Sequence, residues 1–311
     1  MPRKVVLDCD PGIDDAFAIA FGCGHPGIDL RGVTTVAGNV GLPLTTGNAL
    51  AVLEFLGRAD VPVAAGSPGP LLRPFADARH VHGESGLGGA RLPAPHGAPD
   101  GSHAVDFLIG QVTAAPGEVT LVATGPLTNV ALAVRRHPPL VTQVADVIIM
   151  GGSAGRGNTT PAAEFNIACD PEAAAIVFGA GWRVTMAGLD VTHQALATAE
   201  VQERLRALDR LGSDLLLPGL RGYGGTAPAQ GQPVHDLCAL ALVVAPGLFG
   251  CEPARVEVET QGRWTSGMTV TDFAAPADAH NALVAMSLDA AGFWDMVLDA
   301  LGRAAAVMPA G

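Results

Sequence analysis

Short apolar runs alternate with helical patterns along most of the chain. The run Lys4–Asp8 is β-branched and uncharged in its middle, which is typical of a strand covered on both faces. Similar runs predict strands at Asp29–Gly38, Val61–Gly66, Val119–Ala123, Asp146–Met150 and Trp182–Leu189. Helical patterns lie at Ala16–Ala20, Leu44–Leu56, His103–Ala114, Val130–Arg136, Pro171–Phe178, Glu200–Leu211, Val234–Ala241 and Phe293–Ala305.

This alternation predicts one α/β domain over residues 1–311. We expect a mostly parallel, Rossmann-like central sheet with helices on both faces. The segment Arg255–Asp272 alternates like a small C-terminal β-hairpin. The segments 66–99 and 218–233 are rich in Gly and Pro and break the pattern. A long irregular segment such as 66–99 is usually functional or mobile.

Four carboxylates follow the first predicted strand within eight residues: Asp8, Asp10, Asp14 and Asp15. Pro11 and Gly12 end the strand and allow a helix to begin near Asp14. Two like charges about 4 Å apart repel by about 4 kcal/mol at an effective dielectric of 20, so this group favours a bound cation. Oxygen ligands indicate a hard ion, Ca²⁺ or Mg²⁺. The alternative is a solvated acidic turn in which one Asp caps the helix.

Other predicted strands end in Gly or small polar residues, at Gly38-Asn39, Thr124–Asn129 and Gly151-Gly152. Ligands of open α/β sheets bind at the carboxyl ends of the strands. We therefore expect these strand ends and the acidic turn to face one crevice.

Composition narrows the classes of function. The hydrophobic fraction of 49% indicates a large core, and the net charge of −12 argues against binding to nucleic acid. Five cysteines without a CxxC pair are expected to be reduced thiols of a cytoplasmic protein. Neither a signal peptide nor an apolar run long enough to span a membrane is predicted.

The string Asp8–Ala16 resembles the signature of the inosine-uridine preferring nucleoside hydrolases, and three further motifs match that family. They are Val81–Gly89, Glu164-Phe165-Asn166 and His235-Asp236. The resemblance covers nearly the whole chain. It implies hydrolysis of the N-glycosidic bond of purine or pyrimidine ribonucleosides, in nucleoside salvage, by a homodimer or homotetramer.

The resemblance also implies roles for single residues. Asp10, Asp15, Asp236 and the backbone carbonyl of Thr124 would hold Ca²⁺, with Asp10 also the general base that takes a proton from water. His235 would be the acid that assists the leaving base, as an imidazolium near neutral pH. The remaining substrate contacts implied are Asp14, Asn39, His82, Met150, Asn158, Glu164, Asn166, Tyr223 and Asp236.

Several alternatives stay open at this stage. Glu164–Asn166 is also typical of a turn with a helix cap, and Met150 of core packing. Leu237 stands where the family usually has proline, and Tyr223 is the only aromatic residue of 218–233, where relatives commonly carry a longer helix over the base. Two other functions are a ribonucleoside-binding protein without turnover and a Mg²⁺-dependent phosphohydrolase of the haloacid dehalogenase type.

Overall fold

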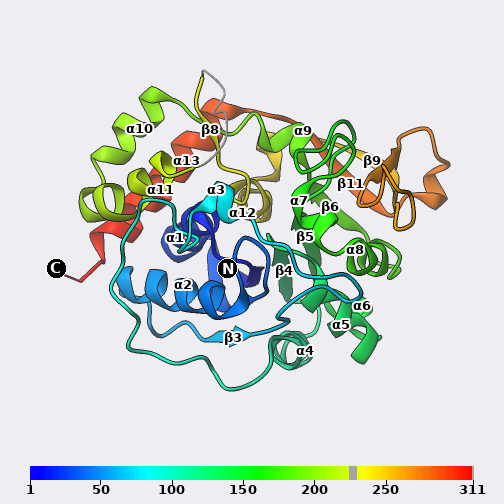
Figure 1. Cartoon of the computed structure of the whole chain (residues 1–311), viewed down its shortest axis with the longest axis horizontal. Coiled ribbons are helices and arrows are strands. Elements are labelled where there is room, and N and C mark those ends of the chain that lie inside the picture. The colour runs from blue at the N-terminus through cyan, green and yellow to red at the C-terminus, as the bar shows by residue number, and fades with distance from the viewer. Residues whose placement is uncertain (224–229, 310–311) are drawn as a thin grey trace.

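Nine strands form one twisted sheet at the centre of the molecule (Figure 1). The computed structural model describes residues 1–223 and 230–309. The strand order is β10-β9-β11-β6-β5-β4-β1-β2-β3. Their bounds are β1 Arg3–Cys9, β2 Ile28–Thr35, β3 Val63–Ala65, β4 Val119–Ala123, β5 Asp146–Met150, β6 Val184–Ala187, β9 Phe249–Val258, β10 Thr269–Asp272 and β11 Ala282–Leu288.

The six pairs from β3 to β11 are parallel. In the part of this sheet that the structure describes, the pairs made by β9 with β11 and with β10 are antiparallel. The expected mostly parallel sheet is therefore confirmed, and so is the hairpin, which pairs Val258 with Thr269. Two features were not expected. The hairpin strand β9 begins at Phe249, and β11 joins the hairpin to the parallel part of the sheet.

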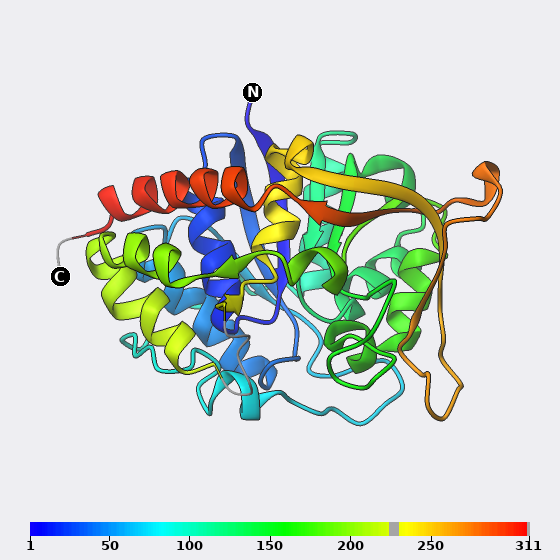
Figure 2. The same cartoon turned by 90° about the horizontal axis from the view of Figure 1, so that it is seen from above.

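Helices cover both faces of the sheet (Figures 1 and 2). One face packs against α1 Ile13–Gly24, α2 Leu42–Phe55, α12 Leu237–Val244 and α13 Ala290–Ala306. The other packs against α4 Ala104–Ala114, α5 Thr128–Arg136 and α8 Pro171–Phe178. Alternation along β1 explains the two layers, because Val5 and Leu7 enter the first core and Val6 enters the second. Every side chain from Val5 to Cys9 is thus buried.

Shorter helices, turns and strands lie in the segments between these main elements. They are α3 Arg79–His82, α6 Leu140–Gln143, α7 Phe165–Cys169, α9 Leu189–Thr192, α10 Ala199–Arg206, α11 Leu217–Arg221, a π-helical turn Leu211–Leu216, 3₁₀ turns Pro246–Leu248 and Ala277–Ala279, and the strand pair β7 Leu196–Ala197 with β8 Gln232–Pro233. The polar helix expected over Glu200–Leu211 therefore ends at Arg206. The structure gives no helix, within its described ranges, of the length and apolarity that a membrane crossing requires.

Candidate active site

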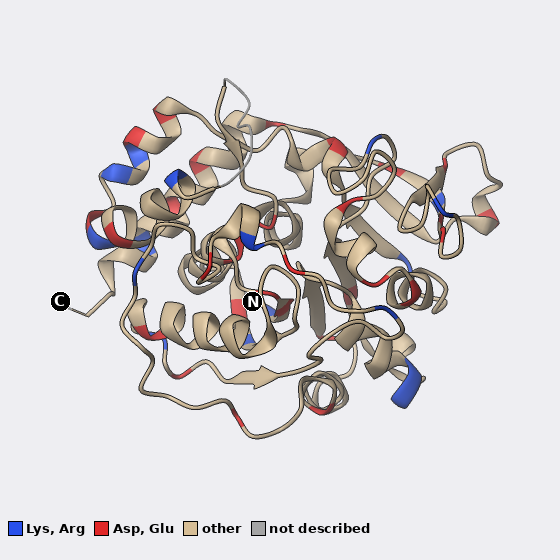
Figure 3. Cartoon of the chain, in the orientation of Figure 1, with Lys and Arg blue, Asp and Glu red and all other residues tan. Residues whose placement is uncertain are grey.

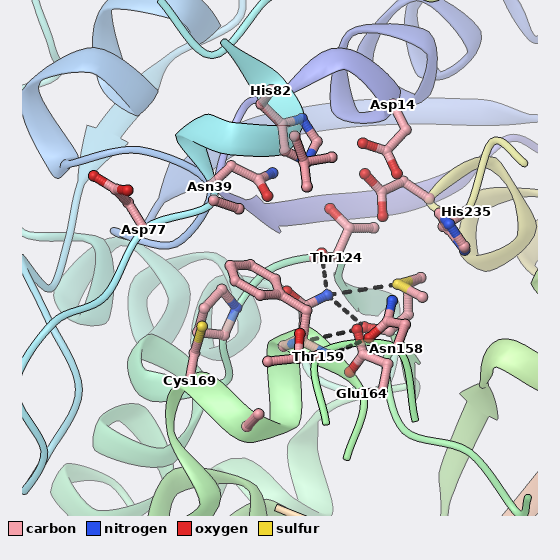
Figure 4. Close-up of a pocket in the computed structure, with 18 of the residues that line it drawn as sticks. Asp14, Asn39, Asp77, His82, Thr124, Asn158, Thr159, Glu164, Cys169 and His235 are labelled. Atoms are coloured by element: carbon pink, nitrogen blue, oxygen red, sulfur yellow. Dashed lines mark hydrogen bonds between the residues drawn. The ribbon is translucent and has the colours of Figure 1, made fainter. Parts of the chain in front are cut away.

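A cavity of about 830 Å³ opens at the carboxyl ends of the parallel strands (Figure 4). Asp10 and Asp15 are not among the residues that line it and are 1% and 0% exposed. The other predicted site residues all line it, and they are Asp14, Asn39, His82, Thr124, Met150, Asn158, Glu164, Asn166, Tyr223, His235 and Asp236. The single crevice expected from the strand ends is therefore present, and it gathers residues from both halves of the chain.

Backbone and amide donors hold the turn that follows β1. Asp15 Oδ2 accepts hydrogen bonds from the Gly12 N–H at 2.8 Å and from Asn39 Nδ2 at 3.2 Å. Its Oδ1 accepts one from Thr124 Oγ1 at 3.1 Å, and the Asn39 N–H donates to Asp10 Oδ2 at 2.6 Å. A Cβ on Gly12 would lie 2.6 Å from Asn39 Nδ2, so only glycine lets the turn pack this closely. These contacts bring together the ends of β1, β2 and β4.

Buried carboxylates crowd together beside this turn. Asp14, Asp15 and Asp236 each place one oxygen within 4.8 Å of the others, and acidic segments lie around α1 and α12 in Figure 3. Burial raises the pKa of Asp14 to about 8, and repulsion from Asp15 adds to the effect. Burial and neighbouring carboxylates also raise the pKa of Asp10 and Asp236 well above the usual range. The turn is thus not a solvated one.

Asp8 has a different role from the other three aspartates of the signature. Its Oδ1 accepts hydrogen bonds from Thr34 Oγ1 at 2.6 Å and from Asn129 Nδ2 at 2.8 Å. Burial raises the pKa of Asp8 to about 6, although these two hydrogen bonds act to lower it. Asn129 also accepts a hydrogen bond from the Ser67 N–H at 2.9 Å. Asp8 therefore braces β1 against β2 and α5 beneath the site, a role that the sequence did not indicate.

The wall opposite the acidic turn is built around Glu164. Its carboxylate accepts hydrogen bonds from the backbone N–H groups of Asn166 at 3.0 Å, Gly152 at 2.9 Å and Ile167 at 3.1 Å. Glu164 is thus the N-cap of α7. The helix cap that was an alternative from the sequence is therefore present in a residue that also lines the cavity.

Asn166 joins this wall to the strand ends. Its Nδ2 donates to the carbonyl of Thr124 at 2.7 Å and to that of Met150 at 3.1 Å. A carbonyl oxygen has two lone pairs, so the Thr124 oxygen can accept a second contact. On the same wall, Asn158 Oδ1 accepts from the Phe165 N–H at 3.0 Å. The side-chain amides of this wall are therefore oriented before any ligand arrives.

The segment that carries His82 is folded over the acidic turn. The His82 side chain is 5% exposed, and its Nδ1 accepts a hydrogen bond from the Ile13 N–H at 3.2 Å. Burial lowers its pKa to about 4. Tyr223 lies beside it with ring centroids 5.5 Å apart. Residues 224–229 of the predicted base-side segment 218–233 lie outside the described residues.

His235 is buried at the other end of the acidic cluster. Its Nδ1 is 2.8 Å from Thr192 Oγ1, and the ring of His193 meets it edge to face at 5.6 Å. Burial lowers its pKa to about 3, with the neighbouring histidines His193 and His82 adding to the effect. This lowered pKa favours the neutral ring, and the role of His235 as the acid stays a prediction. Thr192 and His193 are contacts that no motif in the sequence marked.

The geometry agrees with comparisons to known proteins. The sequence model of a family described as inosine-uridine preferring nucleoside hydrolase matches residues 5–295. The chain belongs to this family. The resemblance seen in the sequence is therefore confirmed, and the α/β fold of this nucleoside hydrolase is that of a known enzyme family.

Individual relatives of this nucleoside hydrolase cover almost its whole length. An inosine-uridine preferring nucleoside hydrolase of Leishmania major is 46% identical over 309 residues, which span 97% of this chain and 98% of the relative. A non-specific ribonucleoside hydrolase of Salmonella enteritidis is 46% identical over 301 residues, spanning 96% and 98%. A solved purine-preferring ribonucleoside hydrolase of Gardnerella vaginalis has a TM-score of 0.92 at 32% identity, over 97% and 99%. The names of these three relatives thus give three different base preferences.

The raised carboxylate pKa values predict how pH changes the stability of the metal-free hydrolase. A carboxyl group whose pKa rises on folding stabilises the fold at low pH, and this contribution is lost as pH rises through the folded pKa. The buried histidines oppose this only below their unfolded pKa of about 6.5. Between pH 6.5 and 8, where Asp14 with its pKa of about 8 titrates, we expect the melting temperature in chelator to fall.

Thermal unfolding in chelator across pH 6 to 8.5 tests this expectation. The same pH series in excess Ca²⁺ is measured for comparison. We expect Ca²⁺ to raise the melting temperature more at the higher pH. A melting temperature in chelator that rises from pH 6.5 to 8 would contradict it.

Proposed function

We propose that this nucleoside hydrolase cleaves the N-glycosidic bond of ribonucleosides with water, giving ribose and the free base, and depends on Ca²⁺. One observation carries the proposal. A single cavity joins a buried carboxylate cluster to a wall of oriented amide and carboxylate groups. The cluster suits activation of water and the wall suits a polyhydroxylated sugar. The names of the relatives span several base preferences, so we propose purine or pyrimidine ribonucleosides as substrates.

The donor set around the acidic turn fits a hard cation. Asp10 Oδ1 is buried and has no hydrogen-bond partner within the described residues. Burial, with repulsion from neighbouring carboxylates added to it, raises the pKa of Asp10 and Asp236. We propose that Asp10, Asp15, Asp236 and the Thr124 carbonyl hold Ca²⁺, which prefers six to eight oxygen ligands in flexible geometry. When bound, Ca²⁺ supplies positive charge that neutralises the cluster and acidifies a coordinated water.

Asp10 is the general base in this proposal. The Asn39 N–H occupies its Oδ2, which leaves the unpartnered Oδ1 to accept a proton from water. The same contact fixes the plane of the carboxylate. Positioning of this kind matters because general-base catalysis contributes roughly 10²–10⁴-fold only when the base is within hydrogen-bond reach.

The remaining polar side chains bind the sugar. Asp14 and Asn166 would hydrogen-bond the ribose hydroxyls, while Asn158 and Glu164 would hold the 5′-hydroxyl. Asn39 and Met150 would lie against the ribose, and His82 and Tyr223 would cover the nucleoside. Because a missing hydroxyl would leave buried polar groups unpaired, 2′-deoxyribonucleosides are expected to be poor substrates.

His235 would assist departure of the base. A neutral imidazole can donate a hydrogen bond to developing negative charge, so the low pKa of this ring does not prevent the role. Replacing His235 by Ala is expected to slow ribonucleosides by about 10²-fold or more, because the base then leaves without a donor. The artificial substrate p-nitrophenyl riboside, whose leaving group needs no such help, is expected to lose little. Initial rates on both substrates test this, and equal losses would refute the role of His235.

The function itself is tested by reducing-sugar release from inosine, uridine, cytidine, adenosine and 2′-deoxyinosine, with and without a calcium chelator. We expect release from ribonucleosides that is lost on chelation and restored by Ca²⁺. Nucleoside binding by calorimetry without release would favour the binding protein instead. Phosphate release from sugar phosphates would favour the phosphohydrolase, which the family match does not support. A cytoplasmic location and a homodimer or homotetramer stay predictions.

A further inference from the structure

We propose that Thr192 is a positioning residue that fixes the proton of His235 on Nε2, so that this nitrogen is the hydrogen-bond donor facing the leaving base. The position of the proton is inferred from the geometry alone. The contact of His235 with a leaving base rests on the proposed function. It assigns a task to a residue outside every motif of the signature.

The position of Thr192 is set by the turn that follows β5. The short helix α9 begins after Gly188, and the Leu189 N–H donates to the Gly152 carbonyl at 2.9 Å. A Cβ on Gly188 would lie 2.8 Å from that same carbonyl oxygen, so the helix packs on the turn only with glycine there. The Thr192 N–H then bonds the Gly188 carbonyl at 3.0 Å. The hydroxyl is therefore held in a fixed place, and its residue is 0% exposed.

The segment that carries His235 is tied to the same region. The Val234 N–H donates to the Ala195 carbonyl at 3.0 Å, three residues beyond Thr192. The ring of His193, edge to face with that of His235, packs against it from the cavity side of α9. These contacts restrict the orientation of the His235 ring, and its Nδ1 lies 2.8 Å from Thr192 Oγ1.

The direction of this hydrogen bond follows from counting donors and acceptors. The Thr192 hydroxyl bonds no other group within the described residues. If it accepted from an Nδ1–H, its own hydrogen would be buried without an acceptor, which costs about 1–3 kcal/mol. If it donates to Nδ1, both groups are satisfied. A neutral imidazole carries one proton, and an Nδ1 that accepts requires that proton to be on Nε2.

The second nitrogen is then the one available to a ligand. His235 lines the cavity, and Figure 4 shows its ring at the end of the cavity next to Asp14. Because Nδ1 is hydrogen-bonded to Thr192 of α9, the Nε2–H is the group that can hydrogen-bond a base in the cavity. Without Thr192 the proton would distribute over both nitrogens, and molecules with the proton on Nδ1 would present an acceptor to the base.

Three variants test this inference. Thr192→Val keeps the shape and removes the hydroxyl, while Thr192→Ser keeps the hydroxyl. Thr120→Val is the matched control, because Thr120 is 1% exposed in β4 and its hydroxyl has no partner within the described residues. The first readout is the ¹⁵N NMR shift of the two His235 nitrogens in the full-length protein, assigned by comparison with His235→Ala. The second is the rate on a ribonucleoside and on p-nitrophenyl riboside.

In the wild type, in Thr192→Ser and in Thr120→Val, we expect the spectrum of a ring protonated on Nε2. In Thr192→Val we expect the two nitrogen shifts to move toward each other as the proton distributes. We expect Thr192→Val to lower kcat on the ribonucleoside about tenfold, the equivalent of one hydrogen bond, with little change on p-nitrophenyl riboside. Thr192→Ser should restore it.

A wild-type ring protonated on Nδ1, or equal spectra for Thr192→Val and the wild type, would overturn the inference. A kcat loss in Thr120→Val that matches the loss in Thr192→Val would do the same, since it would reflect general loss of packing. Absence of any turnover in the wild type would refute the proposed function, and the spectra would still decide the position of the proton.

Discussion

Replacing Asp10 by Asn is expected to remove turnover and, at the same time, to stabilise the metal-free protein. Asn cannot take a proton from water, so kcat should fall by about 10³-fold or more. The Asn oxygen can still accept the hydrogen bond from the Asn39 N–H that Asp10 Oδ2 accepts now. The variant also removes a carboxyl group whose pKa is raised by burial and by repulsion from Asp15 and Asp14, so an unfavourable buried charge is lost. The melting temperature in chelator at pH 8 should therefore rise.

Steady-state kinetics on a ribonucleoside and thermal unfolding in chelator measure the two effects. Asp77→Asn is a matched control, because Asp77 lines the same cavity but is exposed and pairs with Arg79. Unchanged kcat in Asp10→Asn would remove this residue as the base. A lower melting temperature would show that repulsion in the cluster is weaker than the contacts of Asp10.

Replacing Asp15 by Ala also removes a carboxylate from the cluster, but we expect it to destabilise the protein. Asp15→Ala leaves the Gly12 N–H, Asn39 Nδ2 and Thr124 Oγ1 without the carboxylate that accepts from all three. Each unsatisfied buried group costs about 1–3 kcal/mol, which exceeds the relief of one repulsive charge. The free energy of unfolding should therefore drop by several kcal/mol, on the order of the sum of these groups. Turnover should be undetectable, because a proposed calcium ligand is lost.

Denaturant unfolding in chelator and calorimetric titration with Ca²⁺ measure both consequences. Asp15→Asn separates them, since its amide oxygen keeps one acceptor and its stability should lie between those of the wild type and Asp15→Ala. If Asp15→Ala binds Ca²⁺ as tightly as the wild type, Asp15 is not a ligand. If it is as stable as the wild type, the three hydrogen bonds do not hold the turn together.

The residues around the cavity could be predicted because their signals are local. A buried strand followed by clustered acids, and strand ends rich in Gly and Asn, each indicate the same edge of a parallel sheet. The strand β11 gave no such signal. Val284 is the only β-branched residue of Ala282–Leu288, so the segment has low strand propensity, and pairing with β6 and β9 determines its structure.

The contact between Thr192 and His235 could not be predicted for a different reason. The two residues are 43 positions apart, and a single threonine has no spacing that distinguishes it from others. Likewise, the sequence shows four similar aspartates, but only packing separates Asp8, which braces β2 and α5, from the three in the acidic turn. Local pattern thus indicates which residues lie at the carboxyl edge of the sheet, and tertiary contacts decide which partner each one has and what it does.

The three close carboxylates come from two parts of the chain that are far apart in the order in which it is synthesised. Asp14 and Asp15 emerge from the ribosome early, whereas Asp236 emerges only after six strands of the sheet have been made. Domains that depend on such non-local contacts fold late and slowly. A nascent chain that ends before Asp236 therefore holds two of the three close carboxylates, and under the proposed function we expect it to bind Ca²⁺ weakly. During refolding, uptake of Ca²⁺ would thus report the moment when α12 docks on α1.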